Sequence, residues 1–435
     1  MTLAGRLRAR AYRDELDLRV MQYGTETPVA ARAAIQLASL NHEWARIAAT
    51  TEHWGARIRG GGLPAQFASL EEFASKVPVT TRQAVQEHGA AMTSRSRPPD
   101  MVRMTGGSTA SPIQLPAWKS EQLSTRSDMW CGRSWYGVDP GSRLFLLWGH
   151  SHLLGTGAAG WVRARRMELS DRLLGYRRFS AYDLQPAKMR RAVDALLAFQ
   201  PDYVIGYSVA LDLLARANAD RADAVRALKV RVVVGTSEGF PAADSTAVLG
   251  SLFGCPIAME YGSVETGVIA HTHPDGGYRV FWRSHLLEAV GQGPARRLLL
   301  TSLYPRAFPL VRYEIGDEIE TEPVSDEPFA GLAGFRRVVG RCNDYVVLND
   351  GFTVHSEVFS HAVRPCNAVR GFQVRQDGDD IRIHYTSEAE LPPEQGQGIR
   401  VRLSRVHPSL GAIRLERVAS LSQTVAGKTR MIVRR

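Results

Sequence analysis

Short apolar runs that alternate with helical patterns constrain the fold of this 435-residue chain more than any other feature. Between residues 143 and 263 these runs read "RLFLLWG", "DYVIGYS", "VRVVVGTSE" and "PIAMEYGS". Glycine, serine or threonine comes at the end of each run, so the chain turns at the carboxyl end of a strand. Proteins of the α/β class place their functional sites at that end.

The region before residue 100 is predicted to be mostly helical. Alanine-rich segments around 28–49 and 69–90 place apolar residues at helical spacing, and Thr80 or Thr81 is a candidate N-cap in the second segment. Helices followed by alternating strands and helices indicate an α/β protein.

Two domains are expected, because a chain of 435 residues exceeds what one ordinary hydrophobic core supports. About 95 residues with their own strand and helix signals follow "VVGRCND", including a hairpin around Asp377-Gly378. We therefore predict a large N-terminal α/β domain of several subdomains over 1–340, with β-sheets flanked by helices. A small, mobile α+β C-terminal domain over 341–435 would follow it, with a hinge near 341–344.

Charge and cysteine content narrow the classes of function. The net charge of +10 comes almost wholly from arginine, since only five lysines are present, and the arginines are scattered among 44 acidic residues. This pattern argues against nucleic-acid binding and leaves anionic substrates such as nucleotides open. The cysteines Cys131, Cys255, Cys342 and Cys366 lie far apart, as expected for reduced thiols of a cytoplasmic protein. Neither a signal peptide nor a membrane span is predicted.

The stretch "TGGSTASP" at 105–112 combines consecutive small residues with four hydroxyl side chains. Backbone N–H groups and hydroxyls in such a stretch form a concavity that suits phosphate oxygens. No Gly-Lys-Ser/Thr follows and the G-x-G-x-x-G pattern is absent, so neither a P-loop nor a dinucleotide fingerprint is present. Alone, the stretch is more typical of a polar loop.

Four further stretches accompany this loop in a fixed order. They read "MEYGSVETG" at 259–267, "LLLTSLYPRAFPLVRYEIGD" at 298–317, "VVGRCNDYVVLNDGFTVHSEVF" at 338–359 and "AGKTRMIV" at 426–433. Together with "TGGSTASP" they resemble the adenylate-forming superfamily of acyl-CoA synthetases, adenylation domains and luciferases. The chain is most similar to the phenylacetate–CoA ligase branch, which includes capsule-biosynthesis ligases. The resemblance covers roughly residues 100–435.

The resemblance implies where ATP binds. Phosphate contacts are implied for Thr105, Gly106, Gly107, Ser108, Thr109 and Ser111, and further nucleotide contacts for Ser237, Glu238, Glu260, Tyr261, Gly262, Ser263, Asp317 and Arg341. Tyr261 would stack on adenine and Asp317 would accept the ribose hydroxyls. Ser111 stands where the family usually has lysine, so the loop has lost one cation. As structural alternatives, Tyr261 belongs to a strand-end turn and Ser237 caps a helix.

The same resemblance implies a metal-binding residue, a catalytic lysine and a hinge between the two domains. Glu265 would hold Mg²⁺, which prefers oxygen ligands, although it could also be an acid at a helix N-terminus. Lys428 would bridge the acyl carboxylate and the α-phosphate, unless it is a solvated tail lysine. Asn343 occupies the hinge position, where the family usually has aspartate or lysine. This departure weakens the assignment of the second half-reaction.

The acyl and thiol pocket is the least defined part. "WGHSHL" at 148–153 resembles a motif that lines the acyl pocket, so His150 and His152 are candidate pocket residues. Tyr136 and Gly351 are further candidates. A lone buried histidine, however, is more often part of the core.

A zinc site is a separate hypothesis. Its candidate ligands are His271, His273, His285 and Cys255.

The sequence thus predicts an ATP-dependent ligase that activates a carboxylic acid, aryl or arylacetic, and passes the acyl group to a thiol of CoA or of a carrier protein. ATP, Mg²⁺ and CoA are the expected cofactors. Aromatic residues that favour an aryl acid are Trp130, Trp135, Tyr136, Trp148 and Tyr207. Two alternatives stay open, namely an adenylate-forming enzyme with an amine or other nitrogen acceptor and a non-catalytic nucleotide-binding relative. Oligomeric state is not indicated.

Overall fold

The structure is a computed structural model of the chain. It describes residues 3–104, 113–148, 157–181, 186–237, 239–240, 244–291, 295–321, 330–339, 345–363, 365–366, 368–369, 371–422 and 431–434. Within these residues, no helix is both long enough and apolar enough to cross a bilayer.

The N-terminal region is helical, as predicted. Its helices are α1 (Leu3–Tyr23), α2 (Val29–Thr50), α3 (Glu52–Arg59), α4 (Leu70–Lys76) and α5 (Arg82–Met92). The predicted cap is Thr81, whose Oγ1 accepts a hydrogen bond from the Ala84 N–H at 3.2 Å. The segment 69–90 forms two helices and not one, because Pro78 cannot donate a helical hydrogen bond and keeps Val77 extended.

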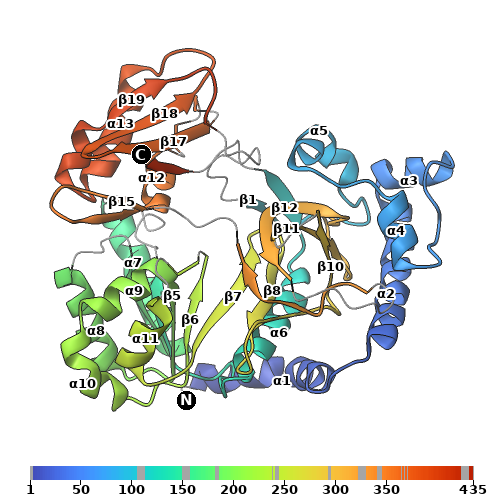
Figure 1. The fold of residues 1–435 in the computed structure, drawn as a ribbon, viewed down its shortest axis with the longest axis horizontal. Helices are drawn as coiled ribbons and strands as arrows, with labels where there is room; N and C mark the ends of the chain where they lie inside the picture. The colour runs from blue at the N-terminus through green and yellow to red at the C-terminus, as the bar shows by residue number, and fades with distance from the viewer. Residues whose placement is uncertain are drawn as a thin grey trace.

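A large sheet forms the centre of the molecule (Figure 1). Its strands are β3 (Leu144–Trp148), β4 (Tyr176–Ser180), β5 (Tyr203–Tyr207), β6 (Val233–Thr236), β7 (Ile257–Ser263), β8 (Gly267–Thr272), β9 (Tyr278–Val280) and β13 (Gly334–Phe335). Within the described residues the order is β13-β9-β8-β7-β6-β5-β3-β4. Strands β4, β3, β5, β6 and β7 are parallel, so their carboxyl ends meet at one edge, here called the carboxyl edge. This edge points toward the C-terminal part of the chain in Figure 1.

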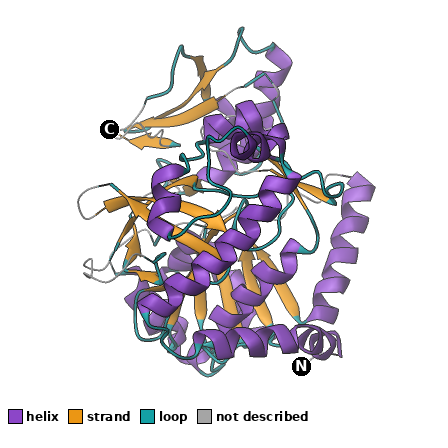
Figure 2. Cartoon of the chain, turned by 90° about the vertical axis from the view of Figure 1, so that its right-hand side faces the viewer, coloured by secondary structure: helices purple, strands orange, loops and turns teal. Residues whose placement is uncertain are grey.

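Helices cover both faces of the parallel strands. Figure 2 shows the helices in purple around the strands in orange. They are α6 (Glu121–Ser134), α7 (Gly157–Leu174), α8 (Pro186–Phe199), α9 (Ser208–Arg216), α10 (Ala222–Arg226) and α11 (Ser245–Phe253). Alternation along β3 divides the core: Phe145 and Leu147 pack with apolar residues of α8, α9 and α11, whereas Leu144 packs with Trp130 of α6. This arrangement explains why the four apolar runs read as continuous hydrophobic stretches.

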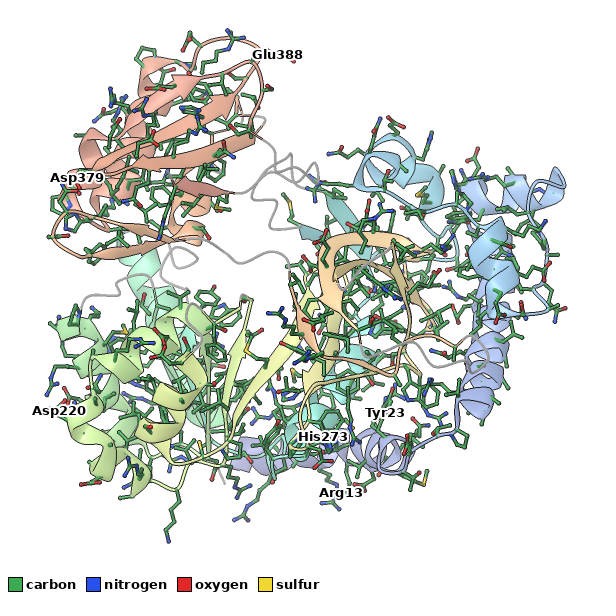
Figure 3. All side chains as sticks on the ribbon, in the orientation of Figure 1. Arg13, Tyr23, Asp220, His273, Asp379 and Glu388 are labelled. Atoms are coloured by element: carbon green, nitrogen blue, oxygen red, sulfur yellow. The ribbon has the colours of Figure 1, made fainter. Side chains whose placement is uncertain are left out.

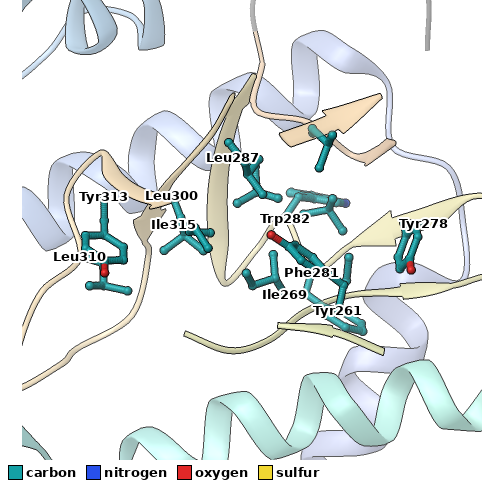
Figure 4. Close-up of a cluster of buried hydrophobic side chains, with 14 of the residues drawn as sticks. Tyr261, Ile269, Tyr278, Phe281, Trp282, Leu287, Leu300, Leu310, Tyr313 and Ile315 are labelled. Atoms are coloured by element: carbon teal, nitrogen blue, oxygen red, sulfur yellow. The ribbon is translucent and has the colours of Figure 1, made fainter. Parts of the chain in front are cut away.

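A second sheet packs beside the antiparallel end of the first one. It consists of β10 (His285–Val290), β11 (Ala295–Ser302), β12 (Tyr313–Glu320) and β14 (Arg337–Val338) in that order. The cluster in Figure 4 fills the space between the sheets, with Tyr261 and Ile269 on one side and Leu287 and Leu300 on the other. This shared core holds β12 close to the end of β7.

The antiparallel strands β1 (Met101–Met104) and β2 (Gln114–Ala117) form a short hairpin, and residues 105–112 lie between them in the chain. The predicted phosphate loop therefore follows β1, although the loop itself lies outside the described residues.

The chain from Tyr345 onward builds a separate core. Its elements are β15 (Tyr345–Val347), β16 (Thr353–His355), α12 (Ser356–Val363), β17 (Gly371–Asp377), β18 (Asp380–Thr386), α13 (Pro393–Ser404), β19 (Arg414–Arg417) and β20 (Ile432–Arg434). The β17–β18 hairpin pairs Asp377 with Asp380 and turns at Gly378, which has a φ of 58°, and this confirms the predicted hairpin. The fold is thus a mixed α/β fold with a large N-terminal and a smaller C-terminal domain, as predicted.

Candidate functional site

The structure describes part of the predicted site. Outside the described residues lie Thr105, Gly106, Gly107, Ser108, Thr109, Ser111, His150, His152, Glu238, Arg341, Asn343 and Lys428. Those it describes are Tyr136, Ser237, Glu260, Tyr261, Gly262, Ser263, Glu265, Asp317 and Gly351. Predictions for the first group stay predictions.

The carboxyl ends of β3, β5 and β6 bring aromatic and small residues together. The rings of Trp148 and Tyr207 lie 4.4 Å apart between centroids. Ser237 follows β6 with a φ of 70°, in the left-handed region that non-glycine residues seldom adopt. Such strain persists only where the surroundings impose it, and it is concentrated at functional sites. Ser237 of the "GTSEGF" stretch is therefore a constrained position at the carboxyl edge.

Tyr261 and Asp317 join the two sheets at the site. The Tyr261 hydroxyl donates a hydrogen bond to Asp317 Oδ2 at 2.9 Å, although 56 residues separate the two in sequence. The Tyr261 ring packs edge-on against Phe335 at 5.7 Å and is 8% exposed. Sequence reasoning selected both residues but did not foresee that one would bind the other. The tyrosine therefore orients the carboxylate, whereas adenine stacking on its ring stays a prediction.

A tight turn follows β7 and carries Glu265. A Cβ on Gly262 would lie 2.1 Å from the carbonyl oxygen of Gly267, so only glycine fits there. Within the turn, the Ser263 N–H donates to Thr266 Oγ1 at 3.0 Å, and that hydroxyl donates to the Gly267 carbonyl at 2.8 Å. These bonds fix the backbone on both sides of Glu265. Its carboxylate is therefore presented by a rigid turn, and not by a helix N-terminus.

Glu260 forms a buried ion pair with Arg133 through both of its carboxylate oxygens. Arg133 Nε donates to Glu260 Oε1 at 2.6 Å, and Arg133 Nη2 donates to Oε2 at 3.1 Å. Burial raises the pKa of the Glu260 carboxyl, but the facing guanidinium outweighs burial and holds this pKa below its ordinary value. The carboxylate therefore has a structural role under the sheet, in place of the nucleotide contact predicted for it. The 127 residues between the partners hide this pair from sequence reasoning.

Two predicted pocket residues lie elsewhere. Tyr136 packs against the cluster that contains Leu144 and Tyr203, the residues that begin β3 and β5. Its hydroxyl donates to the Thr272 carbonyl at 2.8 Å. Tyr136 thus lies at the amino ends of the strands, opposite the carboxyl edge, and the prediction that it lines the acyl pocket is wrong.

Gly351 lies in the C-terminal domain at the turn after β15, with a φ of 81°. A cavity of about 380 Å³ adjoins this turn, lined by Leu348, Asn349, Asp350, Asp379, Asp380, Ile381, His407, Ser409, Leu410, Ala412, Ile413 and Arg414. Asp379 marks its place at the border of the C-terminal domain in Figure 3. A thiol pocket at Gly351 stays a prediction.

The proposed zinc set is not assembled. Among the described residues, which include all four candidates, no group of three or more His, Cys, Asp or Glu side chains is placed to hold a metal ion. His271 is buried with its Nδ1 2.8 Å from the Thr272 carbonyl, whereas His285 packs edge-on against Tyr304. His273 faces Asp275 at 3.1 Å, and Figure 3 shows it on the side away from the C-terminal domain. The zinc hypothesis is therefore wrong, because these side chains serve separate contacts.

Asp128 and His285 are two buried titratable side chains that change the free energy of unfolding with pH in opposite directions. Burial raises the pKa of Asp128 from 3.8 to about 6 despite the Arg19 guanidinium, whereas burial and Arg306 lower the pKa of His285 from 6.5 to about 3. Between pH 4 and pH 6, Asp128 keeps its proton in the folded protein and loses it in the unfolded chain. This group therefore makes the free energy of unfolding fall as pH rises. Over the same range His285 is neutral in the folded protein and protonated in the unfolded chain, so it makes the free energy of unfolding rise with pH. The two contributions to the pH dependence therefore cancel.

Asp128→Asn is expected to remove the contribution of Asp128 to the pH dependence of the unfolding free energy. Relative to the wild-type protein, the variant should gain about 2 to 3 kcal/mol of unfolding free energy between pH 4 and pH 6. Urea unfolding of both proteins at the two pH values measures this difference. His285→Gln should show the reverse trend, and parallel pH profiles for wild type and Asp128→Asn would contradict the assignment.

Comparison with solved structures identifies relatives of this fold. 2-Hydroxyisobutyryl-CoA ligase in complex with 2-HIB-AMP and CoA, in the thioesterification state, gives a TM-score of 0.59 at 17% identity, covering 94% of this chain and 90% of that chain. The same ligase in the postadenylation state with 2-HIB-AMP gives 0.56 at 16% identity, with coverage of 94% and 90%. At such identities the likeness shows a shared fold.

Among curated proteins, protein CapK of Staphylococcus aureus is 24% identical over 216 residues, which are 47% of this chain and 46% of that protein. The match thus spans less than half the length of CapK. No family model matches the sequence.

Proposed function

We propose that this protein is an adenylate-forming ligase. A carboxylate oxygen of the acid would attack the α-phosphorus of ATP and release pyrophosphate, and a thiol would then attack the acyl carbon and release AMP. The observation that carries the proposal is the hydrogen bond from Tyr261 to Asp317, which brings the 259–267 and 298–317 motifs together. The fold shared with 2-hydroxyisobutyryl-CoA ligase supports it.

Asp317 is proposed to hold the ribose. A carboxylate offers about four acceptor positions, so Oδ2 can accept the Tyr261 hydroxyl while the group also accepts sugar hydroxyls. Asp317 is 8% exposed, so little of its carboxylate is left to water. This limited access favours a small polar group such as a diol.

Glu265 suits a divalent cation. Its carboxylate supplies the hard oxygen donor that Mg²⁺ prefers, and the turn that carries it is fixed on both sides. When bound, Mg²⁺ would screen the charge of the triphosphate. Residues 105–112 would contribute N–H groups and hydroxyls to the phosphates, and Lys428 would approach from the C-terminal domain. These roles rest on the sequence resemblance.

The acid is proposed to be aryl or arylacetic. Trp148 and Tyr207 pack together at the carboxyl edge with their rings tilted by 39°, where an acyl group would approach the α-phosphate. Offset aromatic rings of this kind favour flat apolar groups. The acceptor is proposed to be the thiol of CoA or of a carrier protein.

Acid-dependent exchange of pyrophosphate into ATP tests the proposal. With benzoic, arylacetic, cinnamic, fatty and amino acids as the panel, we expect stimulation by aryl or arylacetic acids. Exchange with another class would keep adenylation and reject the aryl assignment. Intact ATP binding without exchange for any acid would favour a non-catalytic nucleotide-binding protein.

A nitrogen acceptor is the second candidate. Ser111 replaces the usual lysine of the phosphate loop and Asn343 the usual hinge residue, so the sequence departs from the usual family pattern at two positions. Release of AMP that depends on CoA, without turnover of amines, would exclude this candidate.

A further inference from the structure

Three charged side chains, two of them buried and one partly buried, connect the β1–β2 hairpin with the turn that carries Glu265. Arg103 belongs to β1, two residues before Thr105, and its side chain is 14% exposed. Glu121 begins α6 just after the hairpin, and Arg306 lies in the connection between β11 and β12. Each of these two residues is 1% exposed. Charges are seldom buried this deeply unless they are paired, so the arrangement calls for an explanation.

Glu121 binds four groups from three segments. Its Oε1 accepts the N–H groups of Trp118 and Ala307, each at 2.9 Å. Its Oε2 lies 3.3 Å from Arg103 Nη2 and 3.8 Å from Arg306 Nε. One carboxylate thus contacts both ends of the hairpin, through Arg103 and Trp118, and the segment at 306–307.

Arg306 extends the group to the turn after β7. One of its terminal nitrogens, Nη2, donates to the carbonyl oxygen of Glu265, and Nη1 donates to the Tyr304 hydroxyl at 3.1 Å. The planar guanidinium fixes the directions of these bonds, which the flexible ammonium of lysine would not. The Glu265 backbone is therefore held by a residue that Glu121 orients.

We propose that Glu121 is a positioning residue that holds the end of β1, from which the segment 105–112 continues in the chain, and the backbone of Glu265 in a fixed relation through Arg103 and Arg306. The inference rests on the proposed function, in which these two segments hold the phosphates and Mg²⁺. Glu121 does not touch a substrate. It holds Arg103 at the end of β1 and, through Arg306, the backbone of Glu265.

The charge of Glu121 is essential to this role. An amide of the same shape keeps acceptor capacity for the Trp118 and Ala307 N–H groups but leaves Arg103 and Arg306 as two like charges in a poorly solvated place. Like charges repel strongly where water is excluded. Arg306 should then shift and release the Glu265 carbonyl, which displaces the site without unfolding the protein.

Glu121→Gln is therefore expected to lower kcat for pyrophosphate exchange by about 10- to 100-fold, since small misplacements of a site carry such costs. It should also raise the Mg²⁺ concentration for half-maximal rate, by roughly fivefold. Loss of folded protein alone would reduce the rate and leave the Mg²⁺ half-saturation unchanged, so this second readout separates positioning from stability.

Glu288→Gln is the matched control. Glu288 forms a buried ion pair with Arg312 at 2.9 Å, and Arg312 donates to the carbonyls of Ala74 and Val77, away from the turn at Glu265. This variant should lose thermal stability as Glu121→Gln does, but keep the wild-type Mg²⁺ half-saturation. Equal half-saturation in both variants would overturn the inference.

Two further measurements test the inference if Glu121→Gln does not fold or if the wild-type protein has no exchange activity. If Glu121→Gln does not fold, Arg306→Lys, which preserves charge but not the two directed bonds, should raise the Mg²⁺ half-saturation, and a wild-type value overturns the inference. If the wild-type protein exchanges no pyrophosphate with any acid, the proposed function fails. Amide hydrogen exchange then decides the coupling: residues 113–118 and 263–267 should exchange faster in Glu121→Gln than in Glu288→Gln, and equal rates refute it.

Discussion

Replacing Lys428 with alanine is expected to reduce acid-dependent pyrophosphate exchange by about two to four orders of magnitude, as loss of a strong electrostatic stabiliser does. A primary ammonium on a flexible stem can contact the acyl carboxylate and the α-phosphate while charge develops on both. Only five lysines occur in the chain, and this one lies in "AGKTR". Transfer from a chemically prepared acyl-adenylate should stay near the wild-type rate, because no bond to the α-phosphate forms in that step.

The half-reactions are measured separately, by pyrophosphate exchange and by transfer from the preformed adenylate. Lys76→Ala is the control, since Lys76 lies exposed in the last turn of α4. This control should match the wild-type protein in both assays. Equal losses in the two half-reactions for Lys428→Ala would contradict the assigned role.

Glu265→Gln is expected to slow exchange by roughly a hundredfold and to raise the Mg²⁺ concentration needed for half-maximal rate. An amide keeps one oxygen donor but removes the charge that a small divalent cation requires. Because the hydrogen bonds of Ser263 and Thr266 fix the turn independently of the carboxylate, the melting temperature should change little. Rates measured against Mg²⁺ at saturating ATP test this expectation.

Glu314→Gln is the control for this substitution, because Glu314 pairs with Arg297 at 2.9 Å in a partly exposed place on β12. Surface pairs of this kind contribute little. An unchanged Mg²⁺ dependence in Glu265→Gln, equal to that of the control, would remove the metal-binding role.

Much of the fold could be predicted from the sequence because it depends on local patterns. The four apolar runs form β3, β5, β6 and β7, and the β17–β18 hairpin turns at Gly378, because buried parallel strands and tight turns demand residue types that a single sequence reveals. The break at Pro78 follows from local chemistry too, and the N-cap expected at Thr80 or Thr81 already indicated where the second helix begins.

The candidate site was predictable only where motifs identify its members. Partners that lie far apart in the chain leave no local signal, so the pairing of Glu260 with Arg133 and of Glu121 with Arg306 emerged only from the structure. Tyr136 was placed in the acyl pocket because aromatic residues suit flat ligands, yet its packing with Leu144 and Tyr203 puts it at the other end of the sheet. Composition shows which residues are available, and the topology decides where they lie.

The bond between Tyr261 and Asp317 also has an evolutionary consequence. In the proposed site, one partner adjoins the base and the other the sugar, so the two halves of a nucleoside are recognised by a coupled unit. Effects of substitutions at residues in direct contact are not additive. A lineage that replaced either residue would lose orientation of the other, and a compensating second change would be favoured. The pair is therefore expected to be inherited together, and nucleotide preference here should drift more slowly than preference for the acid.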